Sequence, residues 1–247
     1  MQATVGTETP TFVFADKYVI TDPANAEFYR LILRGMTHKL NNLLAVIQGF
    51  SSLIMMNDDL EEGIAENLTH MKDAAISASA LSERVLPAGG CSTTTLQPLK
   101  LNDFLHMVSD GLREPCKKLD VPFHLNAAAD IPAVSADSGR LKEIMMELLQ
   151  NAAEAAGPNK GEVALDILPP GKASTNGAVD IFVRNTGSQI PEEKLEEIFK
   201  PFHSTKESSH LGVGLTTAAM LANQMGMRLG VNSENNITTF WLSVPTA

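Results

Sequence analysis

The chain has 247 residues with a formal net charge of −10, and 44% of its residues are hydrophobic but only 5% aromatic. This length predicts one large or two modest domains, and the aliphatic composition favours a helix-rich protein. The sequence contains no cluster of Lys and Arg, which a phosphate-backbone binder needs, so we expect no nucleic acid partner.

The N-terminus lacks the positive charge and apolar core of a signal peptide. No apolar run approaches the roughly 20 residues that a membrane span needs. The two cysteines, Cys91 and Cys116, fit neither a metal spacing nor a disulfide framework. We therefore expect free thiols, a cytoplasmic location and no membrane insertion.

The first long predicted helix begins at Asp22, which can cap it, and Pro23, which suits the first helical position. Its apolar residues recur in alternating steps of three and four, a heptad seam typical of coiled-coil packing. The seam consists of Leu33, Met36, Leu40, Leu43, Ile47, Phe50 and Ile54.

An acidic turn then leads to a second predicted helix that runs to about Leu86. Two antiparallel helices bury little surface alone, so residues 22–86 are predicted to form a helical hairpin that dimerises into a four-helix bundle. Residues 1–21 are an N-terminal extension. Within it, residues 11–20 could form a strand, contact the bundle or be the remnant of an input domain.

Residues 87–97 are rich in Gly, Pro, Ser and Thr and are predicted to be a linker. Residues 98–247 then mix helical patterns with strand-like runs, including a helix at 138–156 and an acidic helix near 191–199. This block predicts an α/β sandwich with a mixed or antiparallel sheet, and the whole chain is predicted to be α+β.

His38 is a candidate functional residue of the first helix. It lies two residues before Leu40 of the seam, so on a helix it points about 200° away, toward solvent or a partner. Asn41 and Asn42 follow at i+3 and i+4 and are predicted to share its face. A lone surface histidine is usually just solvated, but two neighbouring amides favour a functional role.

In the second block, Glu147, Asn151 and Glu154 form a polar line at i, i+4 and i+7 on an otherwise apolar helix. This line could be an ordinary amphipathic face. Carboxylate and amide oxygens also suit Mg²⁺ that holds nucleotide phosphates. Gly212 and Gly214 precede a helix, where backbone N–H groups can meet phosphate.

Five segments, in this order, resemble the sensor histidine kinases of two-component systems, and the resemblance spans residues 25–245. They are "HKLNN", "ELLQNAAEA", "NTGSQIPEEKLEEIFKPFHSTK", "LGVGL" and "GVNSENNITTFWLSVP". The resemblance implies a dimeric hairpin joined to an ATP-binding sandwich of the type found in gyrase and Hsp90.

The resemblance also implies the chemistry. His38 would take the γ-phosphoryl group of Mg-ATP and pass it to an aspartate in the receiver domain of a response regulator, and Asn42 would orient water for dephosphorylation. Asn151 would hold Mg²⁺, with Glu147 as a second candidate. The remaining residues expected to bind nucleotide are Asn185, Gly187, Lys206, Gly212 and Gly214, with Phe199 and Phe202 also retained.

Four positions depart from the family pattern. Lys39 follows the histidine where many kinases have an acidic general base, which contributes roughly 10²–10⁴-fold in rate. Asn185 stands where the family has an Asp that accepts from the adenine amino group. Gln189 and His210 replace glycines, and Gln189 would be strained if its turn required positive φ.

These departures leave two alternatives beside the kinase. One is an ATP-independent histidine phosphotransferase, or a phosphatase of response regulators, with a kinase-like fold. The other is a scaffold that docks regulators without chemistry.

Overall fold

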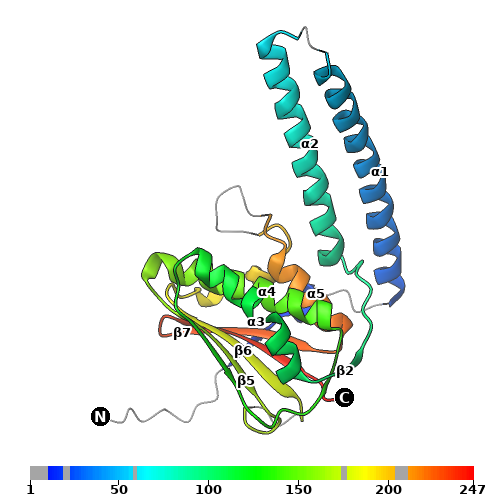
Figure 1. The fold of residues 1–247 in the computed structure, drawn as a ribbon. Helices are drawn as coiled ribbons and strands as arrows, with labels where there is room; N and C mark the ends of the chain where they lie inside the picture. The colour runs from blue at the N-terminus through cyan, green and yellow to red at the C-terminus, as the bar shows by residue number, and fades with distance from the viewer. Residues whose placement is uncertain (1–10, 19–22, 58–59, 174–176, 204–210) are drawn as a thin grey trace.

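The structure is a computed structural model that describes residues 11–18, 23–57, 60–173, 177–203 and 211–247. Helices α1 (Pro23–Met55) and α2 (Glu62–Ala88) form the predicted antiparallel hairpin, which projects from the rest of the chain (Figure 1). No helix in these ranges has both the length and the apolar character required to cross a membrane.

The two hairpin helices contact each other through residues spaced by seven. The side chains buried at this spacing are Thr37, Leu44 and Ser51 on α1 and Leu68, Ala75 and Ser82 on α2. The predicted seam lies elsewhere: from Met36 to Ile54 its side chains are 40–64% exposed. Within one chain, an apolar stripe of α1 therefore remains uncovered.

The rest of the chain is built on a mixed six-stranded sheet of order β1-β7-β8-β6-β5-β3, in which only β3 and β5 are parallel. This arrangement confirms the predicted α+β class. The strands of this sheet are β1 (Val13–Phe14), β3 (Phe123–Ala127), β5 (Val163–Leu168), β6 (Val179–Thr186), β7 (Arg228–Glu234) and β8 (Ile237–Val244). Strands β2 (Gln97–Leu99) and β4 (Val134–Ala136) form a separate pair.

Helices α3 (Leu101–Lys118), α4 (Ser138–Ala156) and α5 (Gly214–Gln224) cover one face of the sheet (Figure 1). Helix α4 has the predicted bounds, and the Asp137 side chain caps it by accepting from the backbone N–H of Arg140 at 3.1 Å.

The acidic helix predicted near 191–199 is replaced by two 3₁₀ turns, η3 (Glu192–Lys194) and η4 (Glu197–Phe199). Pro201 explains why η4 ends at Phe199, because the residue before a proline is pushed out of the helical region. Lys200 is accordingly extended, with ψ 130°.

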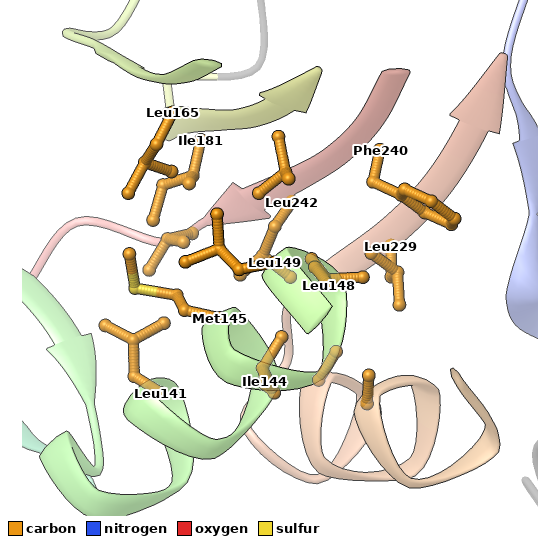
Figure 2. Close-up of a cluster of buried hydrophobic side chains, with 14 of the residues drawn as sticks. Leu141, Ile144, Met145, Leu148, Leu149, Leu165, Ile181, Leu229, Phe240 and Leu242 are labelled. Carbon is orange, nitrogen blue, oxygen red and sulfur yellow. The ribbon is translucent and has the colours of Figure 1, made fainter. Parts of the chain in front are cut away.

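The apolar stripe of α4 packs on the sheet and forms the centre of the core (Figure 2). The labelled core side chains are at most 3% exposed, and burying each stabilises the fold by about 1.5–3 kcal/mol. They are Leu141, Ile144, Met145, Leu148 and Leu149 from α4, and Leu165, Ile181, Leu229, Phe240 and Leu242 from the strands.

The N-terminal segment forms an edge strand of the sheet, the first of the three possibilities for residues 11–20. Strand β1 pairs antiparallel with β7, and Asn232 Nδ2 donates to the Thr11 carbonyl at 2.9 Å. The rings of Phe12 and Phe14 lie 5.2 and 5.7 Å from that of Trp241. The guanidinium of Arg228 lies 4.0 Å from the centre of the Phe14 ring.

Replacing Phe14 by Ala is expected to lower the free energy of unfolding by about 1–2 kcal/mol, because one aromatic pair and one cation–π contact are lost. Urea titration followed by the fluorescence of Trp241, the single tryptophan of the chain, measures this change. Met107→Ala, at a side chain 76% exposed on α3, is the control and should leave the midpoint unchanged. An unchanged midpoint and emission in Phe14→Ala would contradict the packing of β1.

Candidate functional site

A cavity of about 400 Å³ lies on the helix-covered side of the sheet, between α4, the start of α5 and the ends of β6 and β8. This volume is in the range of pockets that bind small molecules. Five residues that the sequence predicts for nucleotide binding line it: Glu147, Asn151, Asn185, Gly212 and Gly214.

At two positions around this cavity, backbone segments lie so close together that only glycine fits without a clash. Gly187 has φ +148°, and a Cβ there would lie 2.7 Å from the carbonyl oxygen of Ala155. Gly212 has φ +69°, and its Cβ would lie 2.7 Å from the carbonyl oxygen of His203. Gln189 also lines the cavity but is not in a positive-φ conformation, so the strain considered for it does not arise.

Two residues singled out in the sequence, Lys206 and His210, lie outside the described residues. The two phenylalanines have different environments: Phe199 is fully buried, whereas Phe202 is 62% exposed. His203 also lines the cavity.

One end of the cavity combines a helix N-terminus with carboxylate and amide groups. Glu147 lies so close to the first residue of α5 that a side chain at Gly214 would collide with its carboxylate. Asn151 Nδ2 donates to the backbone carbonyl of Glu147 at 2.9 Å. Burial raises the pKa of Glu147; Arg84 opposes this shift, and the nearby carboxylates Glu143 and Glu154 add to it.

These oxygens fit a magnesium ion that shares its ligands with phosphates. Mg²⁺ is usually held by one or two protein oxygens plus phosphate oxygens and water. Glu147 and Asn151 can supply such oxygens. Within the described ranges, no three His, Cys, Asp or Glu residues are grouped to hold a metal ion.

At the other end, Asn185 provides an unused hydrogen-bond donor. Its side chain is 2% exposed, and its buried Nδ2 has no hydrogen-bond partner. Leaving such a group unpaired costs about 1–3 kcal/mol. A ligand that offers an acceptor here, as a purine ring does, would remove this cost. The cavity thus fits a nucleotide at both ends.

Arg84 of α2 also lines the cavity, although no sequence pattern singles it out. It is an exposed cation near the end of a helix, a pattern typical of solvated residues. Only the packing of the hairpin beside α5 reveals it. Arg84 therefore brings a positive charge from the hairpin to the end of the cavity that contains Glu147.

His38 is exposed on α1, as predicted, and Asn42 Nδ2 lies 3.5 Å from its Nδ1. With Nδ2 donating, the proton of the neutral ring is on Nε2. If the amide is rotated by 180°, Oδ1 faces Nδ1 instead. The favoured tautomer of the neutral ring then has its proton on Nδ1 and a lone pair on Nε2. Asn42 can thus select the tautomer of His38.

Asn41 does not share the face of His38, which corrects the prediction. Ser82 Oγ donates to Asn41 Oδ1 at 2.7 Å across the hairpin. On an α-helix, position i+3 lies about 60° to one side of position i, and here that side faces α2. Asn41 therefore stabilises the contact between the two helices.

The same hydrogen bond sets the register of the hairpin. His38 lies three residues before Asn41, and Arg84 lies two residues after Ser82. Because the helices are antiparallel, going from Asn41 back to His38 on α1 and from Ser82 on to Arg84 on α2 means moving in the same direction along the hairpin axis. At about 1.5 Å per residue, these distances are about 4.5 Å and 3 Å. His38 and the cavity-lining Arg84 thus occupy nearly the same level of the hairpin.

Comparisons with known proteins agree with this geometry. Residues 136–247 match the family of histidine kinase-, DNA gyrase B- and HSP90-like ATPases. The chain is 28% identical over 223 residues to the sensor kinase CckA of Brucella abortus, an alignment that covers 85% of this chain and 23% of that protein. It spans less than half the length of the first curated relatives that it matches.

Two solved structures share the fold. One is full-length ShkA in complex with AMPPNP, with a TM-score of 0.68 and 22% identity, covering 87% of this chain and 46% of that one. The other is the histidine kinase ThkA in complex with the response regulator protein TrrA, with a TM-score of 0.56 and 22% identity. It covers 87% of this chain and 61% of that one.

The raised pKa of Glu147 gives a prediction for stability. The folded state binds a proton at Glu147 more readily than the unfolded state, so ionisation of this group lowers stability as pH rises. Without nucleotide or Mg²⁺, Glu147→Gln should therefore be more stable than the parent chain at pH 7. The difference should shrink as pH falls toward about 4.3, the ordinary pKa of Glu.

Urea titrations at a series of pH values between 4 and 8 measure this difference. Glu193→Gln, at an exposed side chain, removes the same charge and should leave the pH dependence unchanged. A difference between Glu147→Gln and the parent that does not vary with pH would show that burial of the charge is not its cause.

Proposed function

Because the chain contains a histidine kinase core with an ATPase domain of the gyrase B and Hsp90 type, we propose that it phosphorylates its own His38 from Mg-ATP. The phosphoryl group then passes to an aspartate in the receiver domain of a response regulator. The observation that carries this proposal is the common level of His38 and Arg84 on the hairpin, since Arg84 lines the cavity.

Within the cavity, each group has a role suited to its chemistry. Asn185 meets the base, and the N-terminus of α5 at Gly214 meets the phosphates. Glu147 and Asn151 hold Mg²⁺, and Arg84 neutralises part of the phosphate charge. The bound nucleotide supplies the γ-phosphoryl group.

On the hairpin, the Nε2 lone pair of His38 attacks the γ-phosphorus, and the bond to the leaving ADP oxygen breaks. In the structure the Asn42 amide nitrogen faces Nδ1. With the amide rotated by 180°, Asn42 Oδ1 accepts from Nδ1–H and the lone pair stays on Nε2. Lys39 stands where many kinases have an acidic general base. We propose that Asn42, by holding the His38 tautomer with its lone pair on Nε2, replaces part of the role of that base.

The working form is proposed to be a homodimer joined through the hairpin. The uncovered seam of α1 supports this, because an exposed apolar heptad stripe is what a second copy would bury. The complex of ThkA with TrrA supports a response regulator as the partner. Cys91 and Cys116 are both free, which supports a cytoplasmic location.

Incubating the chain with Mg²⁺ and γ-labelled ATP should label it, and His38→Gln should remove at least about 95% of the label, because no other residue is proposed to accept the phosphoryl group. His70→Gln, another exposed histidine of the hairpin, is the matched control and should be labelled normally. Normal labelling of His38→Gln would reject His38 as the acceptor. Transfer to His38 only from a phosphorylated receiver domain would instead favour a phosphotransferase.

Arg84→Gln should weaken ATP binding by about 10-fold and AMP binding much less, because the lost charge faces the phosphates. Isothermal titration with each nucleotide tests the difference. Lys72→Gln removes a cation from the same helix away from the cavity and should bind both nucleotides normally. An equal loss for ATP and AMP would show that Arg84 does not act on the phosphates.

A further inference from the structure

We propose that the cavity accepts 6-oxopurine nucleoside triphosphates, such as GTP and ITP, as well as ATP. This inference rests on the proposed nucleotide-binding function and names its substrate class. It depends on one feature: the side chain placed to meet the base, Asn185, is an amide whose nitrogen is buried and has no hydrogen-bond partner.

The position of Asn185 assigns it to the base. Along β6, the side chains of Ile181, Val183 and Asn185 point to the same, helix-covered face of the sheet, and all three are at most 2% exposed. Asn185 therefore lies at the floor of the cavity, with Phe240 also in the lining. A flat heteroaromatic ring suits this enclosed end, because the helix N-terminus and Glu147 occupy the end suited to phosphates.

The other polar groups at the floor are already paired with each other. Ser233 Oγ and Thr238 Oγ1 lie 2.8 Å apart and share a hydrogen bond, and Ser233 Oγ also accepts from the backbone N–H of Ile190 at 2.9 Å. Among these groups the Asn185 amide retains an unused donor, so it is the one that can read the edge of a base.

An amide can pair with either purine edge. Adenine presents a donor at its 6-amino group and an acceptor at N1, whereas guanine and hypoxanthine present an acceptor at O6 and a donor at N1–H. Asn185 presents one donor and one acceptor side by side, and rotating the amide by 180° exchanges them. A carboxylate in the same place could only accept, so it would pair with the adenine amino group and repel O6.

The test is calorimetric titration of the full chain with the Mg²⁺ complexes of ATP, GTP and ITP. The unvaried chain should bind ATP and at least one 6-oxopurine triphosphate with affinities within about tenfold of each other, since both make the same number of neutral hydrogen bonds. ITP is included because it has the 6-oxo group without the 2-amino group of guanine. If GTP binds weakly but ITP binds well, the 2-amino group of guanine is the cause, and Asn185 still accepts the 6-oxo group.

Asn185→Asp should raise the preference for ATP over the 6-oxopurine triphosphates at least tenfold, because the donor to O6 is lost and a like charge replaces it. Asn223→Asp, which adds the same charge at an exposed position near the end of α5, should not change the preference. The titrations of the unvaried chain decide the proposal even if Asn185→Asp does not fold.

The outcomes separate this inference from the function on which it rests. If ATP binds but both GTP and ITP bind more than about 100-fold more weakly, the inference is wrong and the kinase proposal stands. An unchanged preference in folded Asn185→Asp would also overturn it. If none of the three nucleotides binds, the proposed use of ATP falls as well.

Discussion

The packing of α4 on the sheet is the interaction on which the rest of the molecule depends. Its apolar stripe, from Leu141 to Leu149, is buried against β5, β6 and the last two strands. The helical period then turns Glu147 and Asn151 away from this stripe and into the cavity. Because one rigid helix carries both sets, the position of the polar groups is fixed by the same contacts that form the core.

A second constraint acts on the hairpin. The buried contact between α1 and α2 combines small side chains such as Thr37, Ala75 and Ser82 with one leucine on each helix, Leu44 and Leu68, while the apolar seam of α1 remains exposed. Asn41 and Ser82 then fix the sliding register of the pair. This polar contact thus holds His38 at nearly the same level of the hairpin as the cavity-lining Arg84, while the apolar seam is left exposed.

The sequence allowed much of this to be predicted, wherever local periodicity decides the outcome. The bounds of α4 and the exposure of His38 follow from patterns within single segments. The placement of Asn151, Asn185 and the glycines near one another was implied instead by the resemblance to sensor histidine kinases. The strain considered for Gln189 did not arise, because its backbone does not adopt the conformation that glycine favours.

What could not be predicted depends on contacts between segments. A side chain at i+3 can turn to either side of a functional face, and only the position of α2 shows that Asn41 turns inward. Arg84 looks like any solvated cation until the hairpin is docked beside α5. The contacts of Asn41 and Arg84 cannot be predicted from their own helix, because they are made with segments distant in the chain.

Strand β1 also affects how the molecule is assembled in time. The bond from Asn232 to Thr11 joins residues 221 positions apart, with the entire hairpin between them. Strand β1 leaves the ribosome well before β7, so this edge of the sheet must wait until β7 has been synthesised. The α1–α2 hairpin, whose contacts are local, can form long before. The sheet is therefore discontinuous in sequence, because its edge strand β1 can pair only after β7 has been synthesised.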